Sequence, residues 1–177
     1  MVKRLYLLRH AKSDYPDGVD DHERPLNARG RKVVLQMADY VKTNIPCPDK
    51  ILCSTALRAK QTAAGVVKAW ENVGDITYVR NLYLASPGEI LKELATLDEA
   101  VHSVMVVGHN PGIAMLAALL FKQGNDKAYQ QMRSKYPTAG LAAFSLQGTW
   151  KHIEPQSAAL ESFMTPAQLD ASEVDDD

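Results

Sequence analysis

Two kinds of hydrophobic pattern alternate along the chain. Short continuous apolar runs indicate buried strands, and apolar residues that recur every three or four positions indicate helices that bury one face. These patterns predict strands at about 3–8, 50–54, 76–80, 103–107, 141–146 and 150–153, and helices at about 28–43, 55–70, 87–96, 112–122 and 126–135. Strands that alternate with helices are typical of an α/β protein, here a three-layer α/β/α sandwich with a mostly parallel central sheet.

Several of the predicted helices begin with residues that favour a helix N-terminus. Asn27 can cap the first helix, and Ser54 or Thr55 can cap the second. The stretch 86–89, Ser-Pro-Gly-Glu, combines a cap, a proline at the first helical position and a capping-box glutamate. The pair 110–111, Asn-Pro, again predicts a cap followed by proline.

The length of 177 residues suits one domain, or one domain with a tail. Residues 1–169 carry the predicted domain, and residues 170–177 form an acidic C-terminal tail that we expect to be disordered. The longest apolar run, 112–121, is too short to cross a bilayer, and the charged Lys3 and Arg4 are not typical of a signal peptide. We therefore expect no membrane partner.

Cysteine spacing and charge limit the function classes further. Cys47 and Cys53 fit neither a zinc site nor a CxxC redox pair, so we expect buried free thiols in a reducing, cytoplasmic compartment. All 20 Lys and Arg lie at or before Lys151 together with 14 of the 21 Asp and Glu, which gives this body a net charge of +6. A mildly basic body suits an anionic ligand, and without a basic helix it does not indicate a nucleic-acid partner.

Charged and imidazole side chains follow three of the predicted strands. The first strand ends in Arg9 and His10, Arg58 lies in the first turn after the second, and His109 ends the fourth, followed by Asn110. In parallel sheets, ligands bind beyond the carboxyl ends of the strands. We therefore expect these residues to converge at one edge of the sheet.

Such a set of side chains forms a site for a phosphoryl group. Arginine binds phosphate oxygens through paired N–H groups, and the start of the helix after Asn110 adds backbone donors. Positive surroundings lower the pKa of a histidine, so a neutral imidazole can attack phosphorus and form a phosphohistidine that water then hydrolyses. No GxGxxG, Walker lysine loop or metal-ligand cluster is present, so we expect no nucleotide cofactor and no metal.

Four sequence elements, in order, resemble the histidine phosphatase superfamily, and in particular its small SixA-type phosphohistidine phosphatases. The first resembles the Arg-His-Gly nucleophile signature of the family, with Ala11 in place of the glycine, and the second resembles its SxxxRxxQT element. The third resembles its second-histidine strand, and the fourth resembles the loop typical of the SixA branch. These elements are Leu7–Ala11, Ser54–Thr62, Val106–Asn110 and Asp21–Gly30. The resemblance covers most of residues 3–169 and implies the same α/β fold.

The resemblance implies a role for each matching residue. It makes His10 the phosphorylated nucleophile, and Arg9, Arg58 and His109 the groups that bind the phosphoryl group, in agreement with the chemistry of the residues themselves. Arg24 joins this set by resemblance alone. The family's mechanism needs no cofactor.

The chain departs from the family where an acid would protonate an alcohol leaving group. Asn110 stands where one branch has aspartate, and Leu84 where another has glutamate. Glu89 is a candidate general acid, although its role as capping-box partner of Ser86 is the stronger expectation. Loop acids after His10 could also reach the site, namely Asp20, Asp21 and Glu23.

A missing acid favours a substrate whose leaving group needs little protonation. The leaving nitrogen of phosphohistidine titrates near neutral pH, so the sequence favours a protein phosphohistidine, such as a phosphorelay component, as substrate. One alternative is a phosphomonoesterase or mutase acting on a small phosphorylated metabolite, with an acid such as Glu89 facing the phosphate. Another is a non-catalytic phosphate-binding regulatory module, which would bind phosphate tightly and form no phosphoenzyme.

Overall fold

A seven-stranded sheet forms the centre of the protein in a computed structural model that describes residues 1–74 and 76–172. The strands lie in the order β3-β2-β4-β1-β6-β7-β5. Their bounds are β1 Val2–Arg9, β2 Lys50–Ser54, β3 Ile76–Val79, β4 Ser103–Gly108, β5 Phe121–Gly124, β6 Leu141–Gln147 and β7 Ala158–Met164. Among these strands only β6 runs against its neighbours, so the expected mostly parallel sheet is confirmed.

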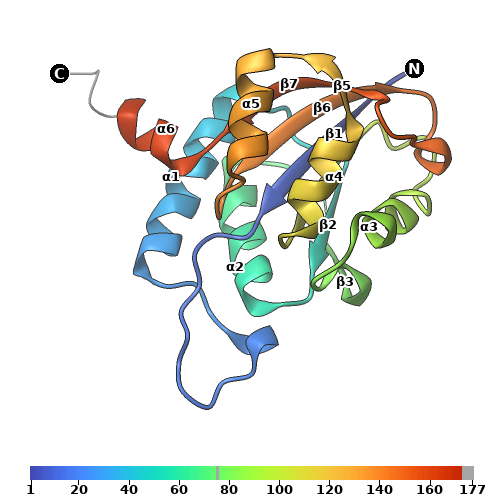
Figure 1. The fold of residues 1–177 in the computed structure, drawn as a ribbon. Helices are drawn as coiled ribbons and strands as arrows, with labels where there is room; N and C mark the ends of the chain where they lie inside the picture. The colour runs from blue at the N-terminus through green and yellow to red at the C-terminus, as the bar shows by residue number, and fades with distance from the viewer. Residues whose placement is uncertain (75, 173–177) are drawn as a thin grey trace.

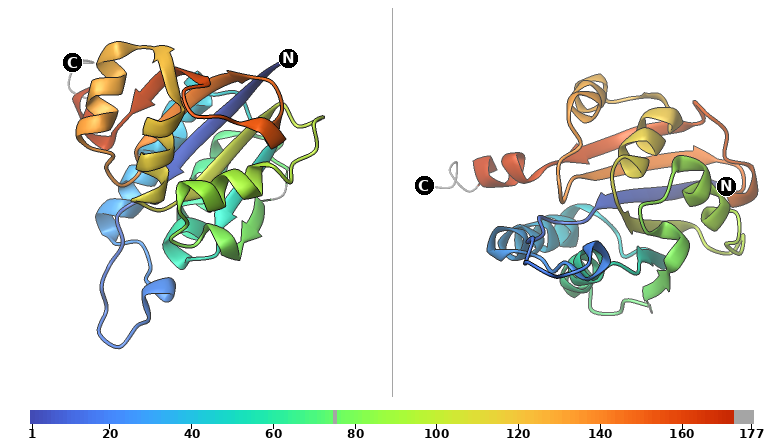
Figure 2. Two further views of the ribbon diagram at one scale, coloured as in Figure 1. Left: turned by 45° about the vertical axis from the view of Figure 1, so that its right-hand side comes forward. Right: turned by 60° about the horizontal axis from the view of Figure 1, so that its bottom comes forward.

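Helices cover both faces of this sheet, which makes the three layers seen in Figure 1 and Figure 2. Their bounds are α1 Ala28–Asn44, α2 Leu57–Val66, α3 Pro87–Leu94, α4 Gly112–Leu120, α5 Asp126–Ser134 and α6 Pro166–Ser172. Short 3-10 turns occupy Asp21–Glu23, Val67–Ala69, Arg80–Leu82 and Trp150–His152. The predicted three-layer α/β/α class is therefore confirmed.

Strand β1 shows how one short apolar run serves both faces. Leu5 and Leu7 pack in the core under α3 and α4, while Tyr6 and Leu8 pack in the core under α1 and α2. Successive side chains of a strand point to opposite faces, so a strand covered on both sides is apolar throughout. Arg9 and His10 follow this apolar run, with Arg9 half-buried and His10 buried.

Some element predictions were wrong. A strand was expected at 150–153, but residues 150–152 form a 3-10 turn. The buried indole of Trp150 donates from Nε1 to the carbonyl oxygen of Val101. The elements β5, β7 and α6 were not predicted. The edge strand β5 reads Phe-Lys-Gln-Gly and has little apolar pattern, and a register shift between Ala143 and Phe144 interrupts the alternation of β7 against β6.

The helix starts were predicted with mixed success. The side chain of Asn27 accepts from the backbone N–H of Gly30, and Ser86 and Glu89 form the expected capping box. Helix α2 begins at Leu57, with Ala56 rather than Ser54 or Thr55 as its N-cap residue, and the Ser54 hydroxyl accepts from the N–H of Ala56. Pro111, and not Asn110, stands at the N-cap position of α4.

Three further expectations concern the ends and surface of the molecule. Both cysteines are free, with Cys53 buried and Cys47 half-buried. Within residues 1–74 and 76–172, no helix has the length and apolar character needed to span a membrane. Helix α6 continues to Ser172, across the start of the expected acidic tail, and the remainder of that tail, 173–177, lies outside the described residues.

Candidate active site

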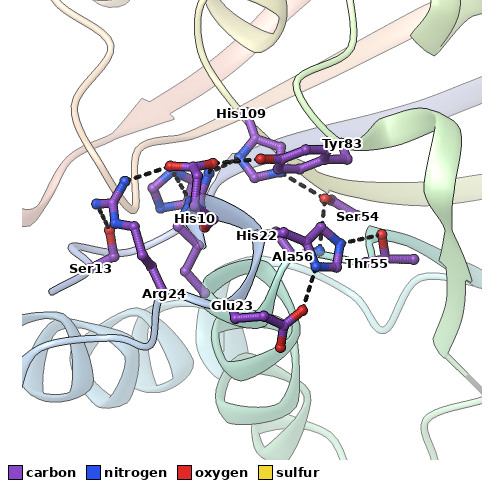
Figure 3. Close-up of polar contacts among 12 residues, drawn as sticks. His10, Ser13, His22, Glu23, Arg24, Ser54, Thr55, Ala56, Tyr83 and His109 are labelled. Carbon is purple, nitrogen blue, oxygen red and sulfur yellow. Dashed lines mark hydrogen bonds and ion pairs between the residues drawn. The ribbon is translucent and has the colours of Figure 1, made fainter. Parts of the chain in front are cut away.

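The strand ends bring the predicted residues together as expected from a parallel sheet. Strand β4 lies between β1 and β2, so His10 after β1 meets His109 after β4, with their ring centroids 5.1 Å apart (Figure 3). Arg58, in the first turn of α2, reaches both rings: its Nε lies 3.3 Å from Nε2 of His10 and its Nη2 lies 3.5 Å from Nδ1 of His109.

These side chains line a cavity of about 710 Å³. Its walls come from the loops after β1 and β4, from the starts of α1, α2 and α6, and from the end of α5. The predicted site residues among its lining are Arg9, His10, Arg24, Arg58, His109 and Asn110. Glu89 is not part of this lining; it is an exposed residue whose carboxylate accepts from the backbone N–H and hydroxyl of Ser86.

His10 presents a neutral imidazole to the cavity. Its Nδ1 lies 2.7 Å from the carbonyl oxygen of Ala11, which can only accept, so the ring proton sits on Nδ1 and the lone pair on Nε2. Burial, with smaller contributions from the positive charges of Arg58 and Arg9, lowers the pKa of His10 to about 4. The sequence indicated the direction of this shift, but burial contributes more to it than the cations do.

His109 is held by the end of strand β2. Its Nε2 lies 2.7 Å from the hydroxyl of Ser54, and burial together with nearby His10 and Arg58 lowers the pKa of His109 to about 3. The Ser54 hydroxyl oxygen also accepts from the N–H of Ala56, so its hydrogen is free to be donated to Nε2. In that arrangement the proton of His109 lies on Nδ1, beside the guanidinium of Arg58.

Asp21 places a carboxylate among these cations. One oxygen accepts from the hydroxyl of Tyr83 at 2.6 Å and from Arg58 Nη2 at 3.0 Å, and the other accepts from Arg24 Nη1 at 2.8 Å. The hydrogen bond from Tyr83 and those from the two arginines hold the pKa of Asp21 well below its usual range. The carboxylate is therefore ionised and cannot act as a proton donor.

Arg9 keeps one donor free. Its Nη1 donates to the carbonyl oxygen of Tyr136 at 2.9 Å, and the amide of Asn110 donates to the same oxygen at 2.9 Å. Its Nε is buried and has no hydrogen-bond partner among the described residues. Buried donors without partners are uncommon in proteins, so Arg9 Nε stands out among the polar atoms of the site.

The loop between β1 and α1 is fixed against the site. Arg24 donates to the Ser13 hydroxyl at 2.6 Å and to the carbonyl oxygen of Asp14 at 2.8 Å. His22 of this loop is half-buried: its Nε2 lies 2.9 Å from the Thr55 hydroxyl and its ring packs edge-on against Tyr83 (Figure 3).

Sequence reasoning missed the contacts that Ser54 and Tyr83 make at this site. Ser54 was expected to cap a helix, and nothing in the local pattern around Tyr83 indicated a contact with a loop 62 residues away. Among the described residues, no group of three or more His, Cys, Asp or Glu side chains forms a metal site.

Comparison with known proteins places this geometry in a family. The histidine phosphatase superfamily (branch 1) model matches residues 5–82. An uncharacterized protein of Mycobacterium tuberculosis is 39% identical over 162 residues, which is 90% of this chain and 99% of that protein. Phosphohistidine phosphatase SixA of Escherichia coli is 30% identical over 131 residues, covering 66% of this chain and 73% of its own.

The solved structures agree with these relatives. A structure from Nakamurella multipartitia, assigned as phosphohistidine phosphatase SixA, matches with a TM-score of 0.82 and 28% identity over 94% of this chain and 97% of that one. The chain therefore belongs to the histidine phosphatase superfamily. Within it, the similarity is to the SixA branch, as the four sequence elements indicated.

Proposed function

We propose that this protein removes the phosphoryl group from phosphohistidine in proteins, through a covalent phosphohistidine at His10. The observation that carries the proposal is the lone pair on Nε2 of His10 beside the guanidinium of Arg58, at the wall of an open cavity. A neutral, positioned imidazole is a nucleophile for phosphorus, and neighbouring cations remove the repulsion from a dianion.

Three side chains can donate to the phosphoryl oxygens. Arg9 lines the cavity, and Nη2 of Arg58 and Nδ1 of His109 lie 3.5 Å apart. When Nδ1 of His109 carries its proton, both of these nitrogens are donors, and an oxyanion between them satisfies both. Donors already oriented toward the charge that develops in the transition state lower its free energy.

The reaction proceeds in two displacements. The lone pair on Nε2 of His10 attacks phosphorus, the substrate's P–N bond breaks, and its electron pair stays on the leaving imidazole. Water then attacks the phosphorus of phosphorylated His10, the new P–N bond breaks, and inorganic phosphate leaves. The other ring nitrogen of the substrate's phosphohistidine titrates near neutrality and takes a proton from water before the bond breaks, so the group that leaves is a neutral imidazole.

The cavity favours this substrate over a phosphomonoester. Asp21 is the one carboxylate among the described lining residues, and it is ionised and bound to two arginines. Leu84 lines the cavity where an acid would stand in another branch, and Glu89 is engaged in the capping box. An alcohol leaving group would lack a proton donor, whereas the imidazole of phosphohistidine needs none from the protein. The name of the E. coli relative supports the same substrate.

Trapping of the phosphoenzyme tests the proposal. We expect a radiolabelled phosphohistidine protein to transfer its label to the wild-type chain, as an acid-labile and alkali-stable adduct, and His10→Asn to abolish both the adduct and turnover. His102→Asn, at an exposed histidine before β4, should retain both. Faster turnover of sugar or glycerate phosphates than of phosphohistidine would favour the metabolite phosphatase. Phosphate binding without any adduct would favour the non-catalytic module.

A further inference from the structure

The cavity extends well beyond the phosphoryl site. Besides the residues that surround the phosphoryl site, its lining includes Lys12 after β1, the first turn of α1, the end of α5 and the start of α6. Helix α6 packs beside α1 there (Figure 1). A volume of about 710 Å³ is in the range of cavities that hold ligands much larger than a phosphate ion.

Three cations line this extension, and we call them the basic groove: Lys12, Arg29 and Lys135. All three are exposed, and none has an ion pair or a side-chain hydrogen bond among residues 1–74 and 76–172. The one carboxylate of the described lining, Asp21, is already paired with Arg24 and Arg58. The positive charge of the basic groove is therefore uncompensated within the described part of the chain.

Arg29 carries its positive charge at a position where that charge disfavours the helix. It lies in the first turn of α1, which contains no acidic residue. A positive side chain near a helix N-terminus is electrostatically unfavourable, so Arg29 weakens the helix that carries it. An anionic partner bound in the basic groove would offset this effect.

Two exposed apolar side chains border the same cavity. Tyr15 is 76% exposed and its ring stacks on the guanidinium of Arg24, with 3.4 Å between the guanidinium carbon and the ring centroid. Leu84 is 53% exposed and holds a left-handed backbone conformation with φ of 50°. Tyrosine and arginine are enriched in protein–protein interfaces, and exposed apolar side chains beside a charged groove suit a protein surface better than a small anion.

We propose that the basic groove binds an acidic surface of the protein that carries the phosphohistidine. This inference rests on the proposed function and adds a second contact region to it, separate from the residues that hold the phosphoryl group. Complementary charge raises the rate of encounter and selects partners, and it acts over a Debye length of about 8 Å at physiological salt. Proteins with acidic residues around the phosphohistidine are then preferred substrates.

A matched pair of peptides tests the inference. Both carry one histidine phosphorylated with phosphoramidate; glutamates flank it in the first peptide and glutamines in the second. We expect the wild-type chain to prefer the glutamate peptide by about tenfold in kcat/KM, since three exposed ion pairs each contribute modestly. The triple variant Lys12→Gln, Arg29→Gln, Lys135→Gln should reduce this ratio to about one. Lys127→Gln, at an exposed lysine at the other end of α5, should keep it.

A second measurement separates this inference from the proposed function. The unphosphorylated glutamate peptide should inhibit hydrolysis of an aryl phosphate by the wild-type chain more strongly than by the triple variant, whether or not phosphohistidine is a substrate. An equal preference for the two peptides, or a preference that survives in the triple variant, overturns the inference. If the triple variant instead weakens only inhibition by fructose 1,6-bisphosphate, the basic groove serves a small anion and the inference is wrong.

Discussion

Asp21 holds its carboxylate against the donors that a phosphoryl group also needs. Arg58 Nη2, Arg24 Nη1 and the Tyr83 hydroxyl all donate to it. In the absence of substrate this arrangement satisfies buried Arg58 and neutralises part of the positive charge of the cavity. A dianionic substrate must compete with the carboxylate for the same guanidinium, and the repulsion between the two anions opposes binding.

Asp21→Asn tests this competition. Removing the negative charge should strengthen binding of inorganic phosphate by about fivefold or more, because a charge a few ångströms away acts strongly in a partly buried site. The measurement is the inhibition constant of phosphate against aryl phosphate hydrolysis. Asp14→Asn, at a loop carboxylate whose side chain does not contact these arginines, is the control. Weaker phosphate binding in Asp21→Asn would mean that the carboxylate serves mainly to orient Arg58.

Helices α3 and α4 both contain a glycine in the first turn, but in different surroundings. A Cβ added at Gly112 of α4 would overlap the carbonyl oxygen of Ala85, whereas one added at Gly88 of α3 would meet nothing within 4 Å. The close approach at Gly112 sets the position of α4 and of the segment before it, which carries His109. Packing therefore requires glycine at the start of α4. At the start of α3, the space around Gly88 would accept a side chain.

These two positions give a matched pair of substitutions. Gly112→Ala should lower the free energy of unfolding by about 2 kcal/mol, since the backbone must shift to relieve the overlap, and should also reduce turnover by moving His109. Gly88→Ala should raise the free energy of unfolding by roughly 0.5 kcal/mol, because alanine favours the helix. Denaturant unfolding and kcat/KM measure the two effects. Equal stability changes in both variants would contradict this account of the packing.

Two buried imidazoles near the centre of the molecule link its stability to pH. The folded chain keeps His10 and His109 neutral, with pKa values of about 4 and about 3, whereas both protonate near pH 6.5 when exposed. The unfolded chain therefore binds more protons than the folded chain below about pH 6.5, and the free energy of unfolding falls as the pH decreases. Acid should destabilise the whole protein through its active site.

The same shifts predict the acid limb of activity. Turnover of a stable aryl phosphate should persist down to about pH 4, because the His10 imidazole keeps its lone pair down to its lowered pKa. Over the same range the free energy of unfolding, measured with denaturant at each pH, should fall. His10→Asn should reduce this fall by on the order of 3 kcal/mol between neutral pH and pH 4. A midpoint of activity near pH 6.5, with the fold intact, would contradict the lowered pKa.

The sequence by itself determined the fold class and the edge at which the site lies. A short apolar run such as β1, in alternation with amphipathic helices, indicates a strand buried on both faces. Parallel strands point their carboxyl ends to one edge of the sheet, so Arg9, His10 and His109 meet there. Local patterns also fixed the capping box at Ser86, which explains why Glu89 is not in the cavity. Each of these features depends on neighbouring residues or on chain direction.

Only the tertiary structure decided which groups from distant segments complete the site. The contacts of Asp21 with Tyr83 and of Ser54 with His109 depend on how loops fold over the sheet, and no periodicity encodes such a contact. Strands β5 and β7 likewise exist because neighbouring strands offer hydrogen bonds, since their own patterns are polar or interrupted. Residue spacing is read along the chain, whereas burial, pairing and the surroundings of a charge arise from what the folded chain brings beside each residue.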